Sequence, residues 1–110
     1  MANNRFKSVT SLITTVNEII YTAPPGVTTI VINAQLANTS DEAVRASFNY
    51  YDSINAREIS LIESFRIAGN DSYSAITGRL VVNENDSIKA YADTDAPIRL
   101  TLSLLETENV

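Results

Sequence analysis

Apolar and polar residues alternate along much of this 110-residue chain, and sustained helical periodicity does not occur. Successive side chains of a β-strand point to opposite faces of the sheet, so a period of two predicts a strand with one buried face. In the clearest example four apolar residues alternate with three polar ones: Ile98, Leu100, Leu102 and Leu104 with Arg99, Thr101 and Ser103. The pattern predicts three further strands, with the inward residues Ile30, Ile32, Ala34 and Leu36; Val44, Ala46, Phe48 and Tyr50; and Ile88, Ala90 and Ala92.

Turn-forming residues separate these segments. Proline has no amide hydrogen, so Pro24 and Pro25 cannot lie inside a sheet, and Gly26 supplies the positive φ that many tight turns need. Asn and Asp bond to their own backbone and tolerate left-handed conformations, so clusters of these residues indicate turns as well. Such clusters lie at residues 38–42, 69–71, 83–86 and 93–97, and we expect the last of them to close a hairpin.

The spacing of these turns predicts an all-β chain that forms a single antiparallel β-sandwich of about seven to eight strands. Periodicity does not reveal strand order, so jelly-roll and immunoglobulin-like (Ig-like) connections both stay open. We expect one domain over residues 1–110, with a short polar N-terminal arm at residues 1–7. Residues 58–67 are expected to form a strand with a slip of phase near Ile62 rather than a short helix. Residues 9–20 are expected to hold one bent strand or two short ones.

The missing residue types exclude most catalytic chemistry. The chain contains no cysteine and no histidine, so it has no thiolate nucleophile, disulfide, imidazole acid–base group or ordinary zinc site. We therefore expect no enzyme activity, no catalytic residue, no cofactor and no metal. The net charge of −5 and the scattered basic residues disfavour nucleic-acid binding. No membrane-spanning segment or signal peptide is evident, so we expect the protein to be made in a cytoplasm and to bind no membrane.

The loop carboxylates are the remaining candidates for chemistry: Asp41, Glu42, Glu84, Asp86, Asp93 and Asp95. They would bind calcium or form an acid–base pair only if two loops met, and solvated turn residues are the favoured interpretation. Exposed tyrosines often anchor protein interfaces. We expect Tyr51 and Tyr91 to point outward and to contribute to an interface. We expect Arg5 and Lys7, in the locally basic arm, to lie over an acidic neighbour.

Three segments carry a resemblance to a known group of proteins. The first leads from IYTAPPG at residues 20–26 into the strand IVI at residues 30–32, the second is AQLANTS at residues 34–40, and the third is GRLVVNENDSIKA at residues 78–90. Over residues 12–106 the chain resembles small β-sandwich proteins in the virions of tailed bacteriophages, of the head decoration (cement) or tail-associated type. In that group a glycine usually precedes the aspartate of the last loop. Here Asn85 precedes Asp86, and asparagine adopts the same left-handed backbone.

The resemblance implies a non-enzymatic structural protein located in the virion. We expect a capsid decoration (cement) protein that stabilises the head shell through contacts with the major capsid protein or another virion protein. We also expect it to associate with itself as a homo-oligomer. A tail, neck or fibre-associated virion protein is the alternative. A third possibility is a carbohydrate-binding module that uses the outward tyrosines and the loop carboxylates.

Overall fold

The computed structural model describes residues 4–76, 78–94 and 98–109. Within these ranges the chain forms nine strands: β1 (Asn4–Ile13), β2 (Glu18–Thr22), β3 (Val27–Asn38), β4 (Val44–Asp52), β5 (Arg57–Ile67), β6 (Ser72–Ser74), β7 (Leu80–Val82), β8 (Ser87–Ala92) and β9 (Ile98–Glu108). Within the same ranges, no helix has the length and apolar character needed to cross a membrane.

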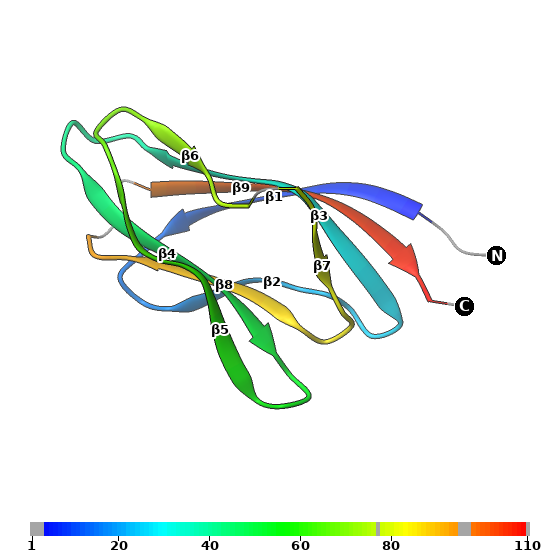
Figure 1. The fold of residues 1–110 in the computed structure, drawn as a ribbon. Coiled ribbons are helices and arrows are strands. Elements are labelled where there is room, and N and C mark those ends of the chain that lie inside the picture. Colours follow the sequence, from blue (N-terminus) through cyan, green and yellow to red (C-terminus); the bar gives the residue numbers. More distant parts are fainter. Residues whose placement is uncertain (1–3, 77, 95–97, 110) are drawn as a thin grey trace.

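The strands form two antiparallel sheets that pack face to face (Figure 1). Sheet A has the order β1-β9-β3-β6, with β7 also paired to β3, and sheet B has the order β2-β8-β4-β5. Consecutive strands lie in different sheets except for the pairs β4–β5 and β6–β7. This alternation is the jelly-roll arrangement and differs from the hairpin-rich Ig-like one. The predicted β-sandwich is confirmed, with nine strands in the described ranges rather than seven or eight.

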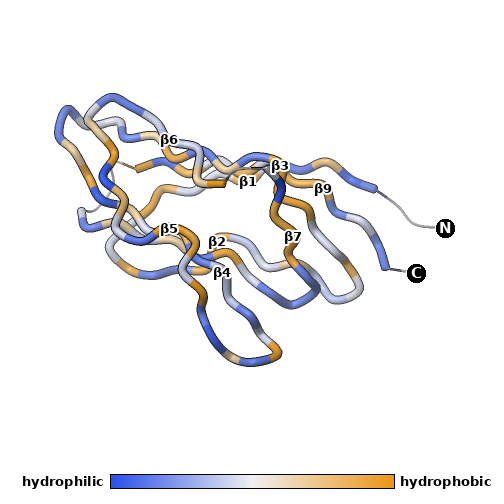
Figure 2. The backbone as a smooth tube through the Cα atoms, viewed as in Figure 1, coloured by the Kyte–Doolittle hydropathy of each residue, from blue (hydrophilic) through white to orange (hydrophobic). Residues whose placement is uncertain are grey.

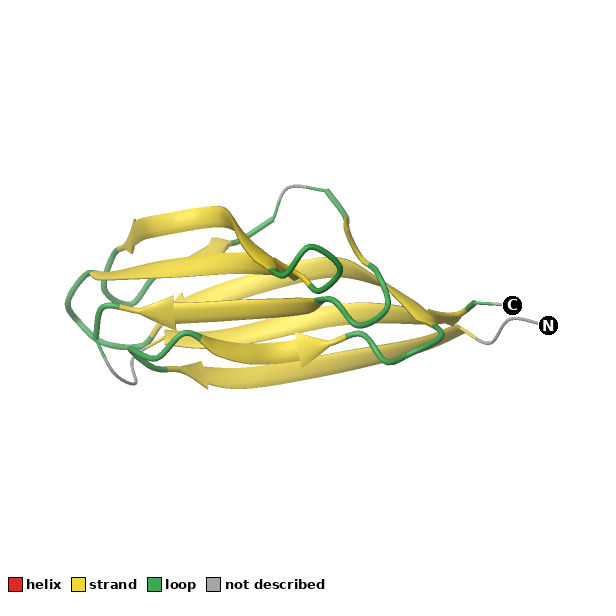
Figure 3. Ribbon diagram, turned by 90° about the horizontal axis from the view of Figure 1, so that it is seen from below, coloured by secondary structure: helices red, strands yellow, loops and turns green. Residues whose placement is uncertain are grey.

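The sandwich is elongated, with extents of 48 × 27 × 20 Å, and most strands run along its length (Figure 3). Strand β9 lies between β1 and β3 in sheet A, and its inward leucines contribute to the core between the two sheets. Three of the predicted alternating segments bury their inward residues as expected: Ile98, Leu100, Leu102 and Leu104; Val44, Ala46 and Phe48; and Ile88, Ala90 and Ala92. Tyr50, the last inward residue predicted for β4, is half-buried.

Strand β3 departs from the predicted alternation. Of its four predicted inward residues, Ala34 and Leu36 are buried, but Ile32 is 40% exposed and Val31 takes a core position with 0% exposure. The pairing of β3 with β9 shifts between Val31 and Asn33, which makes Ile32 an extra, bulged residue. A bulge reverses the alternation of a strand. The prediction for Ile30 and Ile32 was wrong. Residues 30–32 are all apolar, so alternation there does not indicate which side chains face the core.

Both irregular segments form strands. Strand β5 covers residues 57–67, and its pairing with β4 shifts on both sides of the Phe48–Ile62 pair, which confirms the slip of phase near Ile62. Residues 9–20 contain the end of β1 at Ile13 and the start of β2 at Glu18, so two strands lie here rather than one bent strand.

The predicted N-terminal arm is wrong for residues 4–7. Residues Asn4 to Lys7 begin β1 and pair with residues 107 to 104 of β9. Strand β9 presents backbone hydrogen-bonding groups along its whole length, so these residues pair with it although most of their side chains are polar. Residues 1–3 lie outside the described ranges.

The predicted turns occur, but several of them join the two sheets. Gly26 and Asn85 both have the expected positive φ, at 77° and 67°. Their two turns contact each other, because the Gly26 amide donates a 2.7 Å hydrogen bond to the Glu84 carboxylate. The segment after β8 does not close a hairpin, since β8 belongs to sheet B and β9 to sheet A. Residues 95–97 of that segment lie outside the described ranges.

Candidate functional site

The outer face of sheet A carries apolar side chains that cross four strands in register. Phe6 of β1 lies opposite Leu105 of β9, which lies opposite Ile30 of β3. Ile30 in turn lies opposite Val81 of β7. Phe6 is 77% exposed and Val81 is 51% exposed, and the bulged Ile32 adds a further exposed side chain. We call these five residues the apolar row.

Apart from Leu12 and Ala37, the rest of this face is polar but nearly uncharged. Its outward strand positions carry small polar side chains: Asn4, Ser8, Thr10, Thr28, Asn33, Gln35, Ser72, Ser74, Thr101, Ser103 and Thr107. In the described part of sheet A, Arg99 is the only charged residue at such a position, although the whole chain has a net charge of −5. Charged residues are depleted from the centres of protein interfaces because their desolvation is costly. The outer face of sheet A therefore carries few charges that contact with another protein would have to desolvate.

Arg5 and Lys7 occupy positions of β1 that face the inner side of sheet A. The Lys7 ammonium lies 4.0 Å from the Glu106 carboxylate and 5.8 Å from the centre of the Tyr21 ring. Tyr21 donates a 2.5 Å hydrogen bond to Glu106 and shares a 2.7 Å hydrogen bond with Thr29. Burial and the hydrogen bond to Glu106 raise the pKa of Tyr21 to about 12. Arg5 lines a small depression beside Glu106. The structure brings the two basic residues together around a carboxylate of their own chain.

Tyr51 and Tyr91 lie on the outer face of sheet B, and both are half-buried. The Lys89 ammonium lies 5.6 Å from the centre of the Tyr51 ring, a cation–π geometry. Arg5 and Lys7 lie on β1 in sheet A, so the four predicted interface residues belong to two different sheets. They do not form one continuous surface.

A polar network on sheet B escaped the sequence analysis. The Glu58 carboxylate accepts hydrogen bonds from Asn17 at 2.8 Å and Asn49 at 2.6 Å, and Lys89 lies 3.1 Å away. Burial acts to raise the pKa of Glu58, but the hydrogen bonds from Asn17, Lys89 and Asn49 outweigh it and hold the pKa below its ordinary value. The network ties the loop before β2 to β5. Its members come from four separate segments, so no local pattern reveals it.

Among the described residues, the loop carboxylates do not gather into one metal site. The interpretation as solvated turn residues is wrong for Asp86, which is 3% exposed and accepts hydrogen bonds from Tyr50 at 2.5 Å and from Ser53 at 2.8 Å. Burial and the hydrogen bond to Asp86 raise the pKa of Tyr50 to about 12. Asp95 lies outside the described ranges. Within them, no three His, Cys, Asp or Glu side chains lie where they could hold a metal ion.

The apolar row was not predicted as a site, for two reasons. Phe6 lies in the segment expected to form a polar arm, and Ile30 and Ile32 lie in the alternation expected to face the core. One local signal was present, since Phe6 is a large apolar residue within the otherwise polar segment 3–8. The remaining members, Leu105 and Val81, join the row only through strand pairing, which periodicity does not show.

No family model and no curated protein matches this sequence. Among solved structures, the fold is similar to a chain from Bacillus endospore appendages, described as disulfide-linked pili, with a TM-score of 0.58 and 14% identity. That match covers 99% of this chain and 88% of the other. The fold is also similar to a chain of the T13 particle of infectious bursal disease virus (IBDV), with a TM-score of 0.56 and 9% identity, over 96% of this chain and 31% of that one.

A chain of the Gx strain of the same virus has a TM-score of 0.50 at 7% identity, over 99% of this chain and 33% of that one. This chain thus spans about a third of the length of both viral chains. The structural neighbours are therefore pilus and virus-particle proteins, and at these identities the likeness concerns the fold.

Proposed function

We propose that this chain is a non-enzymatic structural protein of a tailed-phage particle, a capsid decoration (cement) protein that docks on the head shell. The observation that carries the proposal is the outer face of sheet A, where the apolar row crosses four strands on a nearly uncharged face. An apolar row on a nearly uncharged face suits contact with another protein surface. The described ranges hold no cluster of carboxylates suited to a metal, and the whole chain lacks histidine and cysteine.

The fold supports a role as a building block. Its structural neighbours include chains of a viral particle and of pili. The pili are described as disulfide-linked, but this chain contains no cysteine and cannot form such links. Its attachment to a particle therefore uses no disulfide bond. Burial of one exposed Val, Leu or Phe side chain contributes roughly 1.5–3 kcal/mol. Many bound copies together would stabilise the shell.

Docking can be tested with a charge placed in the apolar row. Particles that lack the chain are mixed with the purified protein, and bound copies are counted by electron microscopy over a range of concentrations. Val81→Asp puts a carboxylate in the docking face far from β1, and we expect apparent affinity to fall about 10-fold or more. The variant's fold is checked by circular dichroism.

Ile54→Asp is the matched control for this experiment. Ile54 is 86% exposed in the hairpin between β4 and β5, where Figure 2 shows a hydrophobic tip that projects away from sheet A. We expect this variant to bind particles as the unchanged protein does. Equal binding of the Val81→Asp variant and the control would contradict docking through sheet A.

The same particles distinguish the positions within the virion. Antibody labelling in negative stain is expected to mark the heads, and labelling confined to tails or necks would favour the tail-associated alternative. A carbohydrate-binding role is less well supported, because Lys89 lies over the ring of Tyr51, the outward tyrosine expected to stack on a sugar.

A further inference from the structure

The four edges of the two sheets differ in how well they are protected from pairing with another chain. At one edge of sheet B, β2 has only five residues and a register shift; at the other, β5 has two register shifts and a positive φ of 49° at Ser64. At one edge of sheet A, β6 and β7 have three residues each. Short strands and bulges are the usual protection of sheet edges.

Strand β1 has neither kind of protection. It spans ten residues, contains no proline, and pairs with β9 from Asn4 to Ile13 without a register shift. In the described part of the chain its other edge pairs with no strand. Its large outward side chains, Phe6 and Leu12, are 77% and 50% exposed. A long, regular and exposed edge strand readily accepts a further strand.

We propose that a second copy of this chain occupies this edge, with the two β1 strands antiparallel and Val9 on the two-fold axis. Sheet A of one copy then continues into sheet A of the other. This pairing goes beyond the proposed function and does not depend on it, because it needs no particle. It is an isologous contact, in which the same strand serves both partners.

The side chains of β1 select this register. With Val9 opposite Val9 of the second copy, Phe6 lies opposite Leu12 of the second copy, and this pair occurs twice. The exposed apolar residues of one strand are then covered by those of the other, which stabilises antiparallel pairs. A shift that placed Phe6 opposite Phe6 would also place Arg5 opposite Lys7. Like charges in directly opposed positions are destabilising.

The basic residues are accommodated in the selected register. Arg5 lies opposite Ile13 of the second copy, and Lys7 lies opposite Ser11. A lysine that points inward on an edge strand often discourages pairing. Here its ammonium lies 4.0 Å from the buried Glu106 carboxylate, so its charge is partly balanced within its own chain.

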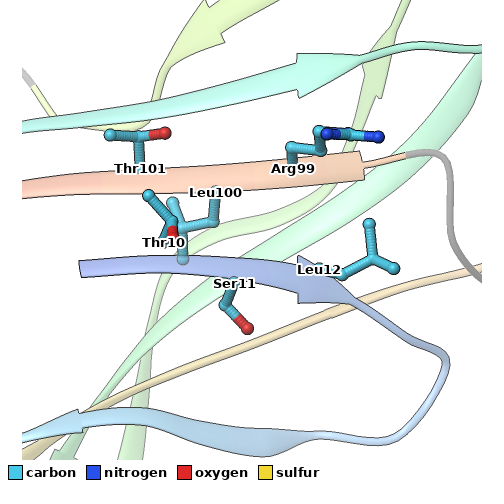
Figure 4. Close-up of a pocket in the computed structure, with 6 residues that line it drawn as sticks. All are labelled: Thr10, Ser11, Leu12, Arg99, Leu100 and Thr101. Atoms are coloured by element: carbon cyan, nitrogen blue, oxygen red, sulfur yellow. The ribbon is translucent and has the colours of Figure 1, made fainter.

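A depression of about 490 Å³ lies at the C-terminal end of β1 (Figure 4), lined by Thr10, Ser11, Leu12, Arg99, Leu100 and Thr101. In the proposed register, Phe6 of the second copy lies next to Leu12, at the border of this depression. Phe6, the most exposed apolar side chain of β1, thus lies beside the depression and next to Leu12, an apolar residue of the other copy.

The first test is a single-cysteine crosslink, which is clean because the chain contains no other cysteine. Opposed Cα atoms of antiparallel strands are about 4.5–5.5 Å apart, within the range a disulfide spans. Val9→Cys is therefore expected to form a disulfide-linked dimer about 10-fold or more faster than Ser8→Cys under the same mild oxidant. In the proposed register the two residues at position 8 are roughly 8 Å apart, too far for a disulfide.

Both cysteine variants are first compared in reduced form by circular dichroism and thermal unfolding, to show that they fold. Each is also oxidised in denaturant, where crosslinking is expected to be equally slow. Equal rates for Val9→Cys and Ser8→Cys in the folded protein would overturn the proposed register.

The second test introduces charges at both positions of the Phe6–Leu12 pair. In the double variant Phe6→Lys with Leu12→Lys, a lysine would face a lysine at both symmetry-related pairs of the dimer. We expect the dissociation constant measured by analytical ultracentrifugation to rise about 10-fold or more. In the matched variant Phe6→Lys with Leu12→Glu, opposite charges face each other, and we expect dimerisation to be largely retained. A protein that stays monomeric at all concentrations, or two double variants with the same dissociation constant, would overturn the proposal.

Discussion

At Gly69, the missing side chain lets two loops touch. A Cβ atom at this position would lie 2.8 Å from the Glu42 amide nitrogen and would also collide with the Asp41 carbonyl group. The nearby Asn38 side chain donates to the carbonyl oxygens of Glu42 and Ile67 and so ties the same loops together. This end of the sandwich depends on a close approach of backbones that only glycine permits.

We predict that Gly69→Ala lowers the free energy of unfolding by about 2–3 kcal/mol, because backbone atoms must move to admit the methyl group. Gly26→Ala is the matched control. Nothing lies within 4 Å of a Cβ atom there, so only its positive φ of 77° opposes the substitution, at about 1–2 kcal/mol. Urea denaturation measures both variants, and an equal or smaller loss for Gly69→Ala would refute the steric argument.

Two tyrosines hydrogen-bonded to carboxylates predict a loss of stability at alkaline pH. The pKa of Tyr21 and of Tyr50 is raised to about 12, while the unfolded chain has a tyrosine pKa near 10. The folded state therefore holds these protons more tightly. The stability that these two tyrosines contribute to the folded state is fully present below pH 10 and is lost as pH rises from about 10 to about 12.

Denaturant unfolding at a series of pH values tests this. The double variant Tyr21→Phe with Tyr50→Phe should be less stable at pH 8, by about 1–2 kcal/mol for each lost hydrogen bond. Its stability should then fall less steeply than that of the unchanged protein between pH 10 and 12. Parallel curves over that window would show that the two phenols do not control alkaline unfolding.

Among the strands, β9 and β5 differ strongly in how far their side chains are buried. Strand β9 lies between β1 and β3, and its four inward apolar residues are almost fully buried. Strand β5 is an edge strand with two register shifts, and most of its residues are exposed. The difference follows from position in the sheet, since a central strand has neighbours on both sides and the opposite sheet over one face.

We predict that Leu102→Ala in β9 costs about 3 kcal/mol of unfolding free energy, because it leaves a cavity at a side chain with 0% exposure. Leu61→Ala in β5 makes the same chemical change at a side chain that is 38% exposed, and it should cost less than about 1 kcal/mol. Thermal and urea unfolding compare the two. A similar cost at both sites would mean that β5 is covered in solution, for example by another chain.

At the scale of the whole molecule, the jelly-roll order assigns the proposed surfaces to different places. The docking face is the outer side of sheet A, and the proposed pairing edge is β1 at the margin of the same sheet. Two copies paired through β1 would present two docking faces side by side. A face of twice the size binds with higher avidity, so each proposed contact strengthens the other while remaining separately testable.

The sequence by itself determined the local features of this protein. Alternation identified the strands at residues 44–50, 88–92 and 98–104, and turn chemistry located the reversals at Gly26 and Asn85. The slip of phase near Ile62 was also visible, because the apolar pattern of residues 58–67 changes spacing there. These features depend on neighbours along the chain, and a linear pattern records such neighbours directly.

Only the tertiary structure decided which strands lie side by side, and therefore where a site exists. The apolar row joins residues 6, 30, 32, 81 and 105, and the Glu58 network joins residues 17, 49, 58 and 89. The bulge at Ile32 and the pairing of residues 4–7 likewise follow from β9, which lies far away in the sequence. Strand pairing joins backbones whatever their separation along the chain, so a period of two does not indicate which strand lies next to which.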